Sequence, residues 1–291
     1  MTTEAGSSPK KNYFIPIVIA LVLLGFGALV TYKYNEISAY VINDPKADTT
    51  TIGKQVDSLE QLKFKKTIYF TFDDGPCKGS RIISNILNEE QIKATLFIIG
   101  LHVYVDEINY SIYNTIKQNK RIELANHSYT HAFRNRFDYF YAHADSAVGD
   151  FKRCEDSLHF TTNIARSPGR NIWRLDSIRF SDNRKSNITA DSLHSSGFTM
   201  MGWDLEWQYN RRQRIIQTDV QIQSQIENLF LEGHTRTPDH LVILSHDRTF
   251  STPEDSATLH RLIINLKAKN EYNFEFVSRY PRSALEKGVK K

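Results

Sequence analysis

Short runs of β-branched and apolar residues alternate along most of this chain with longer stretches in which apolar residues recur three or four positions apart. In one such stretch, Ile82, Ile86 and Leu87 fall on one stripe and polar residues lie opposite, as in an amphipathic helix. The pattern predicts strands at Thr67–Phe72, Ala94–Ile99, Arg121–Leu124, Phe198–Trp203, Leu241–Leu244 and Phe274–Val277. It predicts helices at Arg81–Gln91, Glu107–Gln118, Tyr139–Leu158, Val220–Leu231 and Glu254–Ala268. Such alternation indicates parallel strands joined by crossover helices, so we expect an α/β domain.

One segment near the N-terminus is apolar throughout: it runs from Phe14 to Val30 without a charged residue. With the residues at its rims it reaches about 20 positions, which as a helix is enough to cross a bilayer. Lys10 and Lys11 precede it, and because positive residues favour the cytoplasmic side, we expect the rest of the chain outside. A buried soluble helix and a cleaved signal peptide are the alternatives. The run is long for a signal peptide and no A-x-A site follows it, so we expect an uncleaved anchor.

Composition supports one folded domain beside this anchor. The chain has 291 residues, and its hydrophobic content of 40% and aromatic content of 12% are typical of a globule rather than a disordered chain. About 215 residues remain for the domain, which is enough for one α/β core. The 37 basic residues nearly balance the 33 acidic ones, so charge gives no case for nucleic-acid binding.

The strongest chemical feature is the sequence Phe72-Asp73-Asp74-Gly75, which directly follows the first predicted strand. Two adjacent carboxylates resist joint ionisation, and a bound cation removes that cost by ligating one carboxylate and leaving its neighbour free as a base. Some fifty residues on, His127 and His131 are four positions apart, so on a helical turn they would share a face. One Asp and two His leave open positions on a zinc-like ion, as a catalytic site requires.

Each motif taken alone has a simpler explanation. Asp-Asp-Gly is most often a turn, and a His-x-x-x-His pair is more often a solvated helix face than a metal site. Three further segments change this assessment: Arg166-Ser167-Pro168-Gly169, Trp203-Asp204-Leu205-Glu206-Trp207 and Leu244-Ser245-His246.

These five segments, in this order, resemble the polysaccharide deacetylase family (carbohydrate esterase family 4, the NodB homology domain). Its motifs are TFDDG, H-[ST]-x-x-H, R-x-P-[YF], D-x-x-D-W and L-x-H, and the resemblance covers roughly residues 66–280. It implies a membrane-anchored bacterial member with a distorted (β/α) barrel, preceded by one transmembrane helix. In such barrels the site forms at the C-terminal ends of the strands, and Asp73, Asp74 and His246 all fall just after predicted strands. The expected organisation is a cytoplasmic tail over 1–12, a transmembrane signal anchor over 13–32, a linker over 33–65, the deacetylase domain over 66–283 and a basic tail over 284–291.

The resemblance also implies the role of each site residue. Asp74, His127 and His131 would hold one divalent metal ion, with Zn²⁺ expected first and Co²⁺, Ni²⁺ or Mn²⁺ as alternatives. Asp73 would be the general base and His246 the general acid, since imidazole titrates near the operating pH.

Further residues would support this pair. Arg166 would orient the base carboxylate through charge-assisted hydrogen bonds. Asp204 is the carboxylate expected to hold His246 in its protonated form. For substrate binding, Leu244 is expected to line the pocket for the acetyl methyl group, and Trp207 and Gly169 to contact the sugar or the oxyanion.

Two departures from the family pattern are evident. Gly169 stands where the family has Tyr or Phe; it keeps the backbone N–H for the oxyanion but loses an aromatic wall of the sugar groove, unless Trp173 or Tyr209 replaces it. The fourth motif is compressed: Asp204 and Trp207 are present without the full D-x-x-D-W spacing.

The chain has only two cysteines, Cys77 and Cys154. In an oxidising compartment an even count permits one disulfide, which we expect here; two unrelated thiols are the alternative. Neither cysteine has another His or Cys at metal-ligand spacing.

The function expected from these features is metal-dependent removal of N-acetyl groups from a polymeric glycan, peptidoglycan first, by a domain anchored in the cell membrane and facing outward. A metal amidase or imidase acting on a non-sugar amide and a non-catalytic glycan-binding domain of the envelope are the alternatives. The presence of Asp73, Asp74, His127, His131 and His246 argues against a mere binder, which gains nothing from a free base and acid. The sequence does not distinguish peptidoglycan from chitin-like or other envelope polymers.

Overall fold

The computed structural model describes residues 66–282. In this part of the chain the strands are β1 (Lys66–Gly75), β2 (Ala94–Ile98), β3 (Ile122–Asn126), β4 (Ile164–Ala165), β5 (Ile172–Arg174), β6 (Arg179–Ser181), β7 (Thr199–Met200), β8 (Leu205–Glu206), β9 (His240–His246) and β10 (Tyr272–Phe274). The helices are α3 (Lys78–Glu90), α4 (Gly100–Val103), α5 (Glu107–Lys117), α6 (His131–Asn135), α7 (Phe137–Ala142), α8 (Ala144–Leu158), α9 (Asn187–Ser195), α10 (Asp219–Leu231) and α11 (Pro253–Ala268), with 3₁₀ turns η1 (Arg184–Ser186), η2 (Asp247–Ser251) and η3 (Val277–Arg279).

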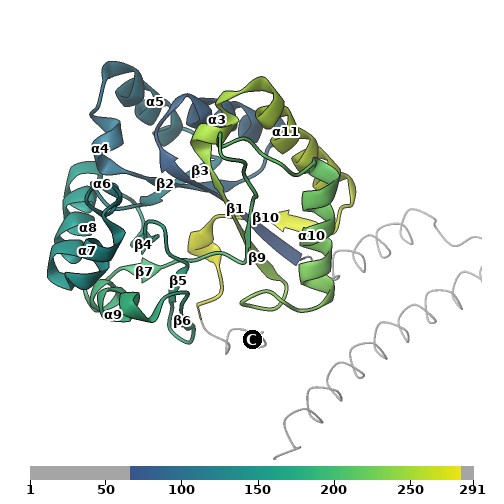
Figure 1. Ribbon diagram of the computed structural model, residues 1–291. Helices are drawn as coiled ribbons and strands as arrows, with labels where there is room; N and C mark the ends of the chain where they lie inside the picture. Colours follow the sequence, from purple (N-terminus) through teal and green to yellow (C-terminus); the bar gives the residue numbers. More distant parts are fainter. Residues whose placement is uncertain (1–65, 283–291) are drawn as a thin grey trace, which may run out of the picture. The chain divides into compact units, whose positions relative to one another are not determined.

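The strands form one curled sheet in the order β6-β5-β7-β4-β3-β2-β1-β9-β8, and β10 pairs with β1. All pairings are parallel except those that β5 makes with β6 and β7. The helices lie around the outside of the strands, with α7, α8 and α9 on one side and α10 and α11 on the other (Figure 1). The sheet is therefore a half-barrel wrapped by helices, which confirms the expected distorted (β/α) architecture.

Strand β1 is the centre of the sheet because it pairs with β2, β9 and β10 and is almost completely buried. Side chains alternate between the two faces of a strand. Ile68, Phe70 and Phe72 belong to the core cluster that includes α3, α5 and α11, whereas Tyr69 packs in a second cluster that fills the interior of the half-barrel. Asp73 is four positions after Tyr69 and so lies on the same face of β1, which places its carboxylate in the interior.

Strand β9 repeats this arrangement beside β1. Leu241 and Ile243 belong to the outer core cluster, and Val242 belongs to the interior one. Leu244 and His246 share the parity of Val242, and His246 is directly opposite Asp73 in the register of the two strands. Two buried parallel strands therefore bring the two residues of the expected acid–base pair to one level of the barrel.

The predicted helices and the strands at β1, β2, β3 and β9 are present in the structure. The predicted strand Phe198–Trp203 is a strand only at Thr199–Met200, as β7, and helix α9 was not predicted. The single helix expected over Tyr139–Leu158 is two helices, α7 and α8, because the chain leaves helical geometry at His143 (φ −123°, ψ 75°). The predicted strand Phe274–Val277 overlaps the observed strand β10 only at Phe274. Strands β4, β5, β6 and β8, of two or three residues each, were not predicted, since they are too short for a periodic pattern.

The predicted disulfide is wrong: Cys77 and Cys154 are both free thiols. Cys77 is the N-cap of α3 and contacts Ser80. Cys154 is completely buried on α8, where its thiol donates to the carbonyl oxygen of Ile98 (3.8 Å). Each sulfur thus packs in its own environment, and burial, with the nearby Asp247 charge, raises the pKa of the Cys77 thiol to about 12.

Within residues 66–282, no helix is both long and apolar enough to cross a membrane. The predicted cytoplasmic tail, anchor, linker and basic tail (1–12, 13–32, 33–65 and 284–291) lie outside the described residues. Their prediction therefore remains one from sequence.

Candidate active site

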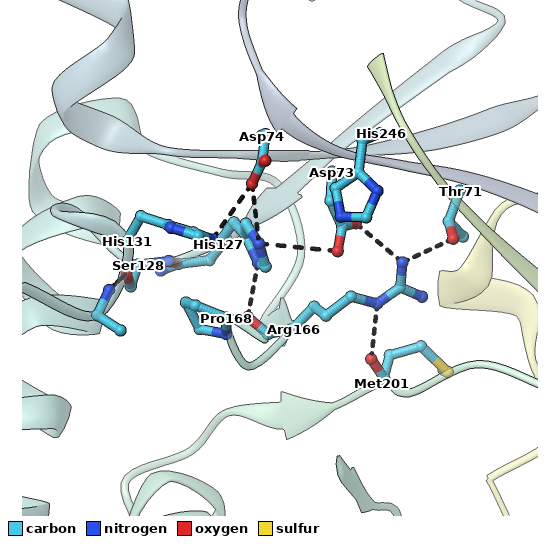
Figure 2. A network of polar contacts seen from close by, with 12 residues as sticks. Thr71, Asp73, Asp74, His127, Ser128, His131, Arg166, Pro168, Met201 and His246 are labelled. Carbon is cyan, nitrogen blue, oxygen red and sulfur yellow. Dashed lines mark hydrogen bonds and ion pairs between the residues drawn. The ribbon is translucent and has the colours of Figure 1, made fainter. Parts of the chain in front are cut away.

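The residues predicted for metal binding and acid–base chemistry converge at one edge of the sheet, whereas Asp204 and Trp207 do not join them. Asp73 and Asp74 lie at the end of β1, His127 directly follows β3, Arg166 directly follows β4, and His246 ends β9. These strands run parallel in the sheet order β4-β3-β2-β1-β9, so their C-terminal ends meet at a common edge. Figure 2 shows the resulting cluster, with His246 near Asp73.

The two adjacent carboxylates reach the same site because β1 is irregular at its end. Consecutive side chains of a regular strand point to opposite faces. Here the register of β1 against β2 shifts between Asp73 and Gly75, and Asp74 has a φ of 78°, which is uncommon for a residue with a side chain. Backbone strain of this kind is concentrated at functional sites. The irregularity turns Asp74 toward the histidines while Asp73 stays on the interior face.

Asp74, His127 and His131 have ligand atoms that lie within 4.8 Å of one another. Asp74 Oδ1 is 3.6 Å from His127 Nε2 and 3.3 Å from His131 Nε2. The Nδ1–H of His127 donates to the carbonyl oxygen of Arg166 (2.9 Å), and that of His131 to Oδ1 of Asn135, which leaves both Nε2 atoms facing Asp74.

These residues fit a divalent metal ion. Asp74 Oδ1 is buried without a hydrogen-bond partner among the described residues, as expected of an oxygen that faces a cation. The fixed orientations of His127 and His131 are those of ligand histidines, whose second ring nitrogen normally donates to a protein acceptor. One carboxylate and two imidazoles form a three-ligand set typical of catalytic zinc.

The histidine pair does not lie on a regular helical turn, so this part of the prediction is wrong. Ser128 has a φ of 64°, and all residues of α6 have positive φ, including 53° at His131. The segment is held in this shape from both sides: Asn126 Oδ1 accepts the N–H of Ser128, and Asp150 accepts the N–H and hydroxyl of Thr130. His127 and His131 are therefore brought together by the hydrogen bonds of this segment rather than by the periodicity of a helix.

Arg166 holds Asp73 in the barrel interior. Its side chain is completely buried, and Nη1 donates to Asp73 Oδ1 (2.9 Å) and to the Thr71 hydroxyl (2.6 Å). Nε donates to the carbonyl oxygen of Met201 (3.0 Å) and Nη2 to that of Gly202 (2.9 Å). The guanidinium is thus fixed by neutral acceptors and by one carboxylate, so it orients Asp73 as the resemblance implies.

Burial and neighbouring charges shift the pKa values of the clustered residues in different directions. Burial opposes ionisation of Asp74, but the neighbouring His127, His131 and His246 lower the pKa of this carboxyl below its usual range. Burial works against a charged His127, yet Asp73 and Asp74 raise the pKa of this imidazole. Burial and the charge on His127 lower the pKa of His131 to about 4. Asp74 is therefore ionised and His131 neutral at neutral pH, as metal ligation requires, whereas the raised pKa of His127 means that this imidazole would release a proton on binding an ion.

Asp204 does not contact His246, contrary to the prediction. Its Oδ1 accepts the backbone N–H of Arg236 (2.7 Å) and its Oδ2 that of Val242 (2.8 Å), so it ties the start of β9 to the loop before it. Glu206 also interacts electrostatically with His246: burial raises the pKa of this carboxyl above its ordinary value, and the charge of His246 opposes that rise. Sequence reasoning missed Glu206, although an acidic residue directly before Trp207 is the part of the fourth motif that this chain keeps.

We expect Asp204→Asn to alter the pH dependence of stability and not that of catalysis. Burial raises the pKa of Asp204 to about 6 in the folded protein. The protonated side chain therefore stabilises the fold fully at pH values below the pKa of the unfolded chain, and this stabilisation is lost as the pH rises through about 6. Between pH 4 and 7 the free energy of unfolding of the wild type should therefore fall by about 2 kcal/mol more than that of the variant. Urea titrations across this range measure the difference; a shifted pH–rate profile with unchanged stability would restore Asp204 to the site.

The predicted substrate residues have different surroundings. Trp207 is only 2% exposed and packs edge-on against Phe250 in the outer core, so it is a packing residue here. Leu244 is also buried, on the interior face below His246. Gly169 is exposed at the site, with a φ of 61°. Of the aromatic residues considered as replacements, Trp173 is completely buried, whereas Tyr209 lies beside the ring of His246 and its hydroxyl accepts the His246 backbone N–H (3.3 Å).

A half-barrel that carries an Asp–His–His cluster beside a second, arginine-held carboxylate is typical of a metal-dependent hydrolase. Comparison with known proteins narrows this class. The family model described as polysaccharide deacetylase matches residues 62–166, and this match, together with the relatives found, supports the polysaccharide deacetylase family for this chain. That family is metal-dependent, and the chain has a candidate Asp–His–His site for the ion.

Two relatives span most of the chain. YheN of Bacillus subtilis (strain 168), a polysaccharide deacetylase by name, is 25% identical over 286 residues, which are 90% of this chain and 89% of the relative. A peptidoglycan-N-acetylglucosamine deacetylase of Bacillus cereus is 26% identical over 277 residues, 91% of each chain.

The fold is that of solved deacetylases. The catalytic domain of a peptidoglycan N-acetylglucosamine deacetylase from Eubacterium rectale superposes with a TM-score of 0.53 at 20% identity, over 75% of this chain and 92% of that one. The homologues and structural neighbours are peptidoglycan and polysaccharide deacetylases, hydrolases of carbohydrate esterase family 4.

Proposed function

We propose that the protein is a metal-dependent hydrolase that removes N-acetyl groups from a polymeric glycan, with peptidoglycan as the first substrate to test. One observation carries this proposal: Asp73 and Asp74, adjacent in sequence, share His127 as a neighbour but differ in their other partners. Asp74 faces two imidazole nitrogens, whereas Asp73 is held by the buried guanidinium of Arg166. A ligand carboxylate and a free, oriented carboxylate are what amide hydrolysis at a metal site requires.

In the proposed reaction, Asp73 accepts a proton from the water that attacks the acetyl carbon. Its Oδ1 is held by Arg166 and its Oδ2 is 3.7 Å from His127 Nε2, so the carboxylate has a fixed direction at the edge of the cluster. His246 donates a proton to the amine nitrogen as the carbon–nitrogen bond breaks, and acetate and a free amine leave. The N–H of Gly169 is the donor assigned to the oxyanion.

The ion would be held by Asp74, His127 and His131. When bound, a divalent ion polarises the acetyl carbonyl and makes water a stronger acid. Zn²⁺ suits two imidazoles and a carboxylate best, and Co²⁺, Ni²⁺ and Mn²⁺ accept the same ligands.

The substrate class is supported by the names of the relatives, among them a peptidoglycan-N-acetylglucosamine deacetylase. A second candidate is an amidase acting on a non-sugar amide, which is favoured by the missing side chain at Gly169. Measuring acetate released by the full chain from N-acetylglucosamine oligomers, peptidoglycan and a small non-sugar acetamide separates the two. Release from a glycan supports the deacetylase; turnover of the small amide alone would contradict it.

We also propose that the domain faces outward from the cell membrane on an uncleaved anchor formed by residues 13–32, since these residues are apolar and follow Lys10 and Lys11. Protease added to intact spheroplasts should digest the domain and leave a tag on Met1 protected. A mature N-terminus near residue 33 would instead indicate a cleaved signal peptide.

A further inference from the structure

Phe137, the first residue of α7, lies beside the candidate metal site. Its ring is edge-on to that of His131, with ring centroids 5.8 Å apart and planes at 85°. The side chain is only partly buried, packing on one side against the cluster that includes Phe140 and Phe151. A partly exposed aromatic ring beside a candidate ligand histidine is thus available to a bound molecule.

The same ring lies against the side of Gly169 where a side chain would begin. A Cβ atom added to Gly169 would lie 2.9 Å from Cε1 and 3.1 Å from Cζ of Phe137, closer than such atoms approach. Gly169 also has a φ of 61°, a region that side chains disfavour. The space that a side chain at position 169 would enter is therefore taken by the ring of Phe137.

The loop that carries Gly169 is fixed relative to this ring. The carbonyl oxygen of Arg166 accepts from His127, and the hydroxyl of Tyr141, from the same helix as Phe137, donates to the carbonyl oxygen of Pro168 (2.7 Å). Helix α7 and the loop are thereby held together, with the Phe137 ring between His131 and Gly169.

We propose that Phe137 is the specificity-determining residue for sugar substrates: its ring forms the wall against which the C–H face of the acetylated sugar packs, and residue 169 is glycine because this ring needs the space. The inference rests on the proposed function. A pyranose buries its apolar face well against an aromatic ring, whereas a small acetamide lacks that face. Phe137 therefore acts on glycan binding rather than on hydrolysis.

The variants to compare in the full chain are Phe137→Ala, Phe137→Trp and Phe133→Ala. Phe133 is a matched control, because it packs partly buried on the same cluster, against Tyr139 and Phe140, and not against His131 or Gly169. Phe137→Ala should weaken the binding of an N-acetylglucosamine oligomer about tenfold and raise KM similarly, while kcat, metal content and turnover of a small acetamide stay within about twofold. Phe137→Trp and Phe133→Ala should bind the oligomer as the parent does.

Gly169→Ala adds a second test of the shared space. Alone, Gly169→Ala should weaken oligomer binding. The double variant with Phe137→Ala should lose less affinity than the product of the two single fold-losses, because the ring that the added methyl group meets is gone. Equal losses in Phe137→Ala and Phe133→Ala, or independent effects at positions 137 and 169, would overturn the inference. Oligomer binding is measured by calorimetry, so this test does not depend on turnover. If the parent binds the oligomer but releases no acetate, the proposed function is contradicted and the inference about Phe137 is not.

Discussion

Asparagine at position 73 should leave the metal ion bound and remove turnover, whereas alanine at position 74 should remove both. Both carboxylates lie near His127, but only Asp74 also faces His131 and only Asp73 is held by Arg166. We expect a loss of acetate release of at least about 10³-fold in Asp73→Asn, because a general base and its orientation are lost together. Metal content of the purified variants, measured by mass spectrometry, tests the division of roles.

Alanine at position 127 or 131 should behave like alanine at position 74. The control is His260→Ala, which disrupts a second group of candidate ligands, Glu89, Glu90 and His260. Glu90 there is already paired with Lys267 and His260, so we expect no change in bound metal. Equal metal loss in Asp73→Asn and Asp74→Ala would show that the two carboxylates are misassigned.

The second large effect is expected at Arg166. Replacing this arginine by methionine leaves Asp73 as a buried charge without its partner, which typically destabilises a protein by about 3–5 kcal/mol. Activity should fall with stability, because the base loses its orientation. The double variant Asp73→Asn with Arg166→Met should recover much of the stability and none of the activity, since no unpaired charge remains.

Arg174 supplies the matched control. It is also almost completely buried, but it pairs with Asp191, whose side chain is about half exposed and can be solvated when the arginine is removed. Arg174→Met should therefore cost less stability and leave the pH–rate profile unchanged. Unfolding by urea, with acetate release measured on the folded fraction, distinguishes the two arginines. A stable, active Arg166→Met variant would contradict the account of the base.

The edge of the sheet that carries the candidate site was predictable from sequence because its residues follow long, buried strands. Strands β1 and β9 are continuous apolar runs, and the polar residues that end them, Asp73 and His246, stand out against that pattern. The rule that sites form at the C-terminal ends of parallel strands then places them together. Strands β4 and β8 have two residues each and owe their conformation to their neighbours in the sheet, so no local sequence pattern predicts them.

The errors arose where side-chain partners decide the outcome. The carboxylate of Asp204 turned toward backbone N–H groups of the adjacent loop and strand, which a motif comparison does not reveal. Cysteine count does not specify packing, and Cys154 is a buried residue of α8. The replacement for an aromatic residue at position 169 was sought at Trp173 and Tyr209, whereas the ring over Gly169 belongs to Phe137, more than thirty positions earlier.

The most direct test of the central claim is a metal titration of the full chain after removal of bound ions. Acetate release from an N-acetylglucosamine oligomer is followed as Zn²⁺ is added, in the parent and in Asp74→Ala. We predict that the parent gains activity until one ion is bound per chain and that Asp74→Ala gains none at the same concentrations. Equal activity of the parent with and without added metal, or full recovery of Asp74→Ala, would contradict a metal-dependent deacetylase at this site.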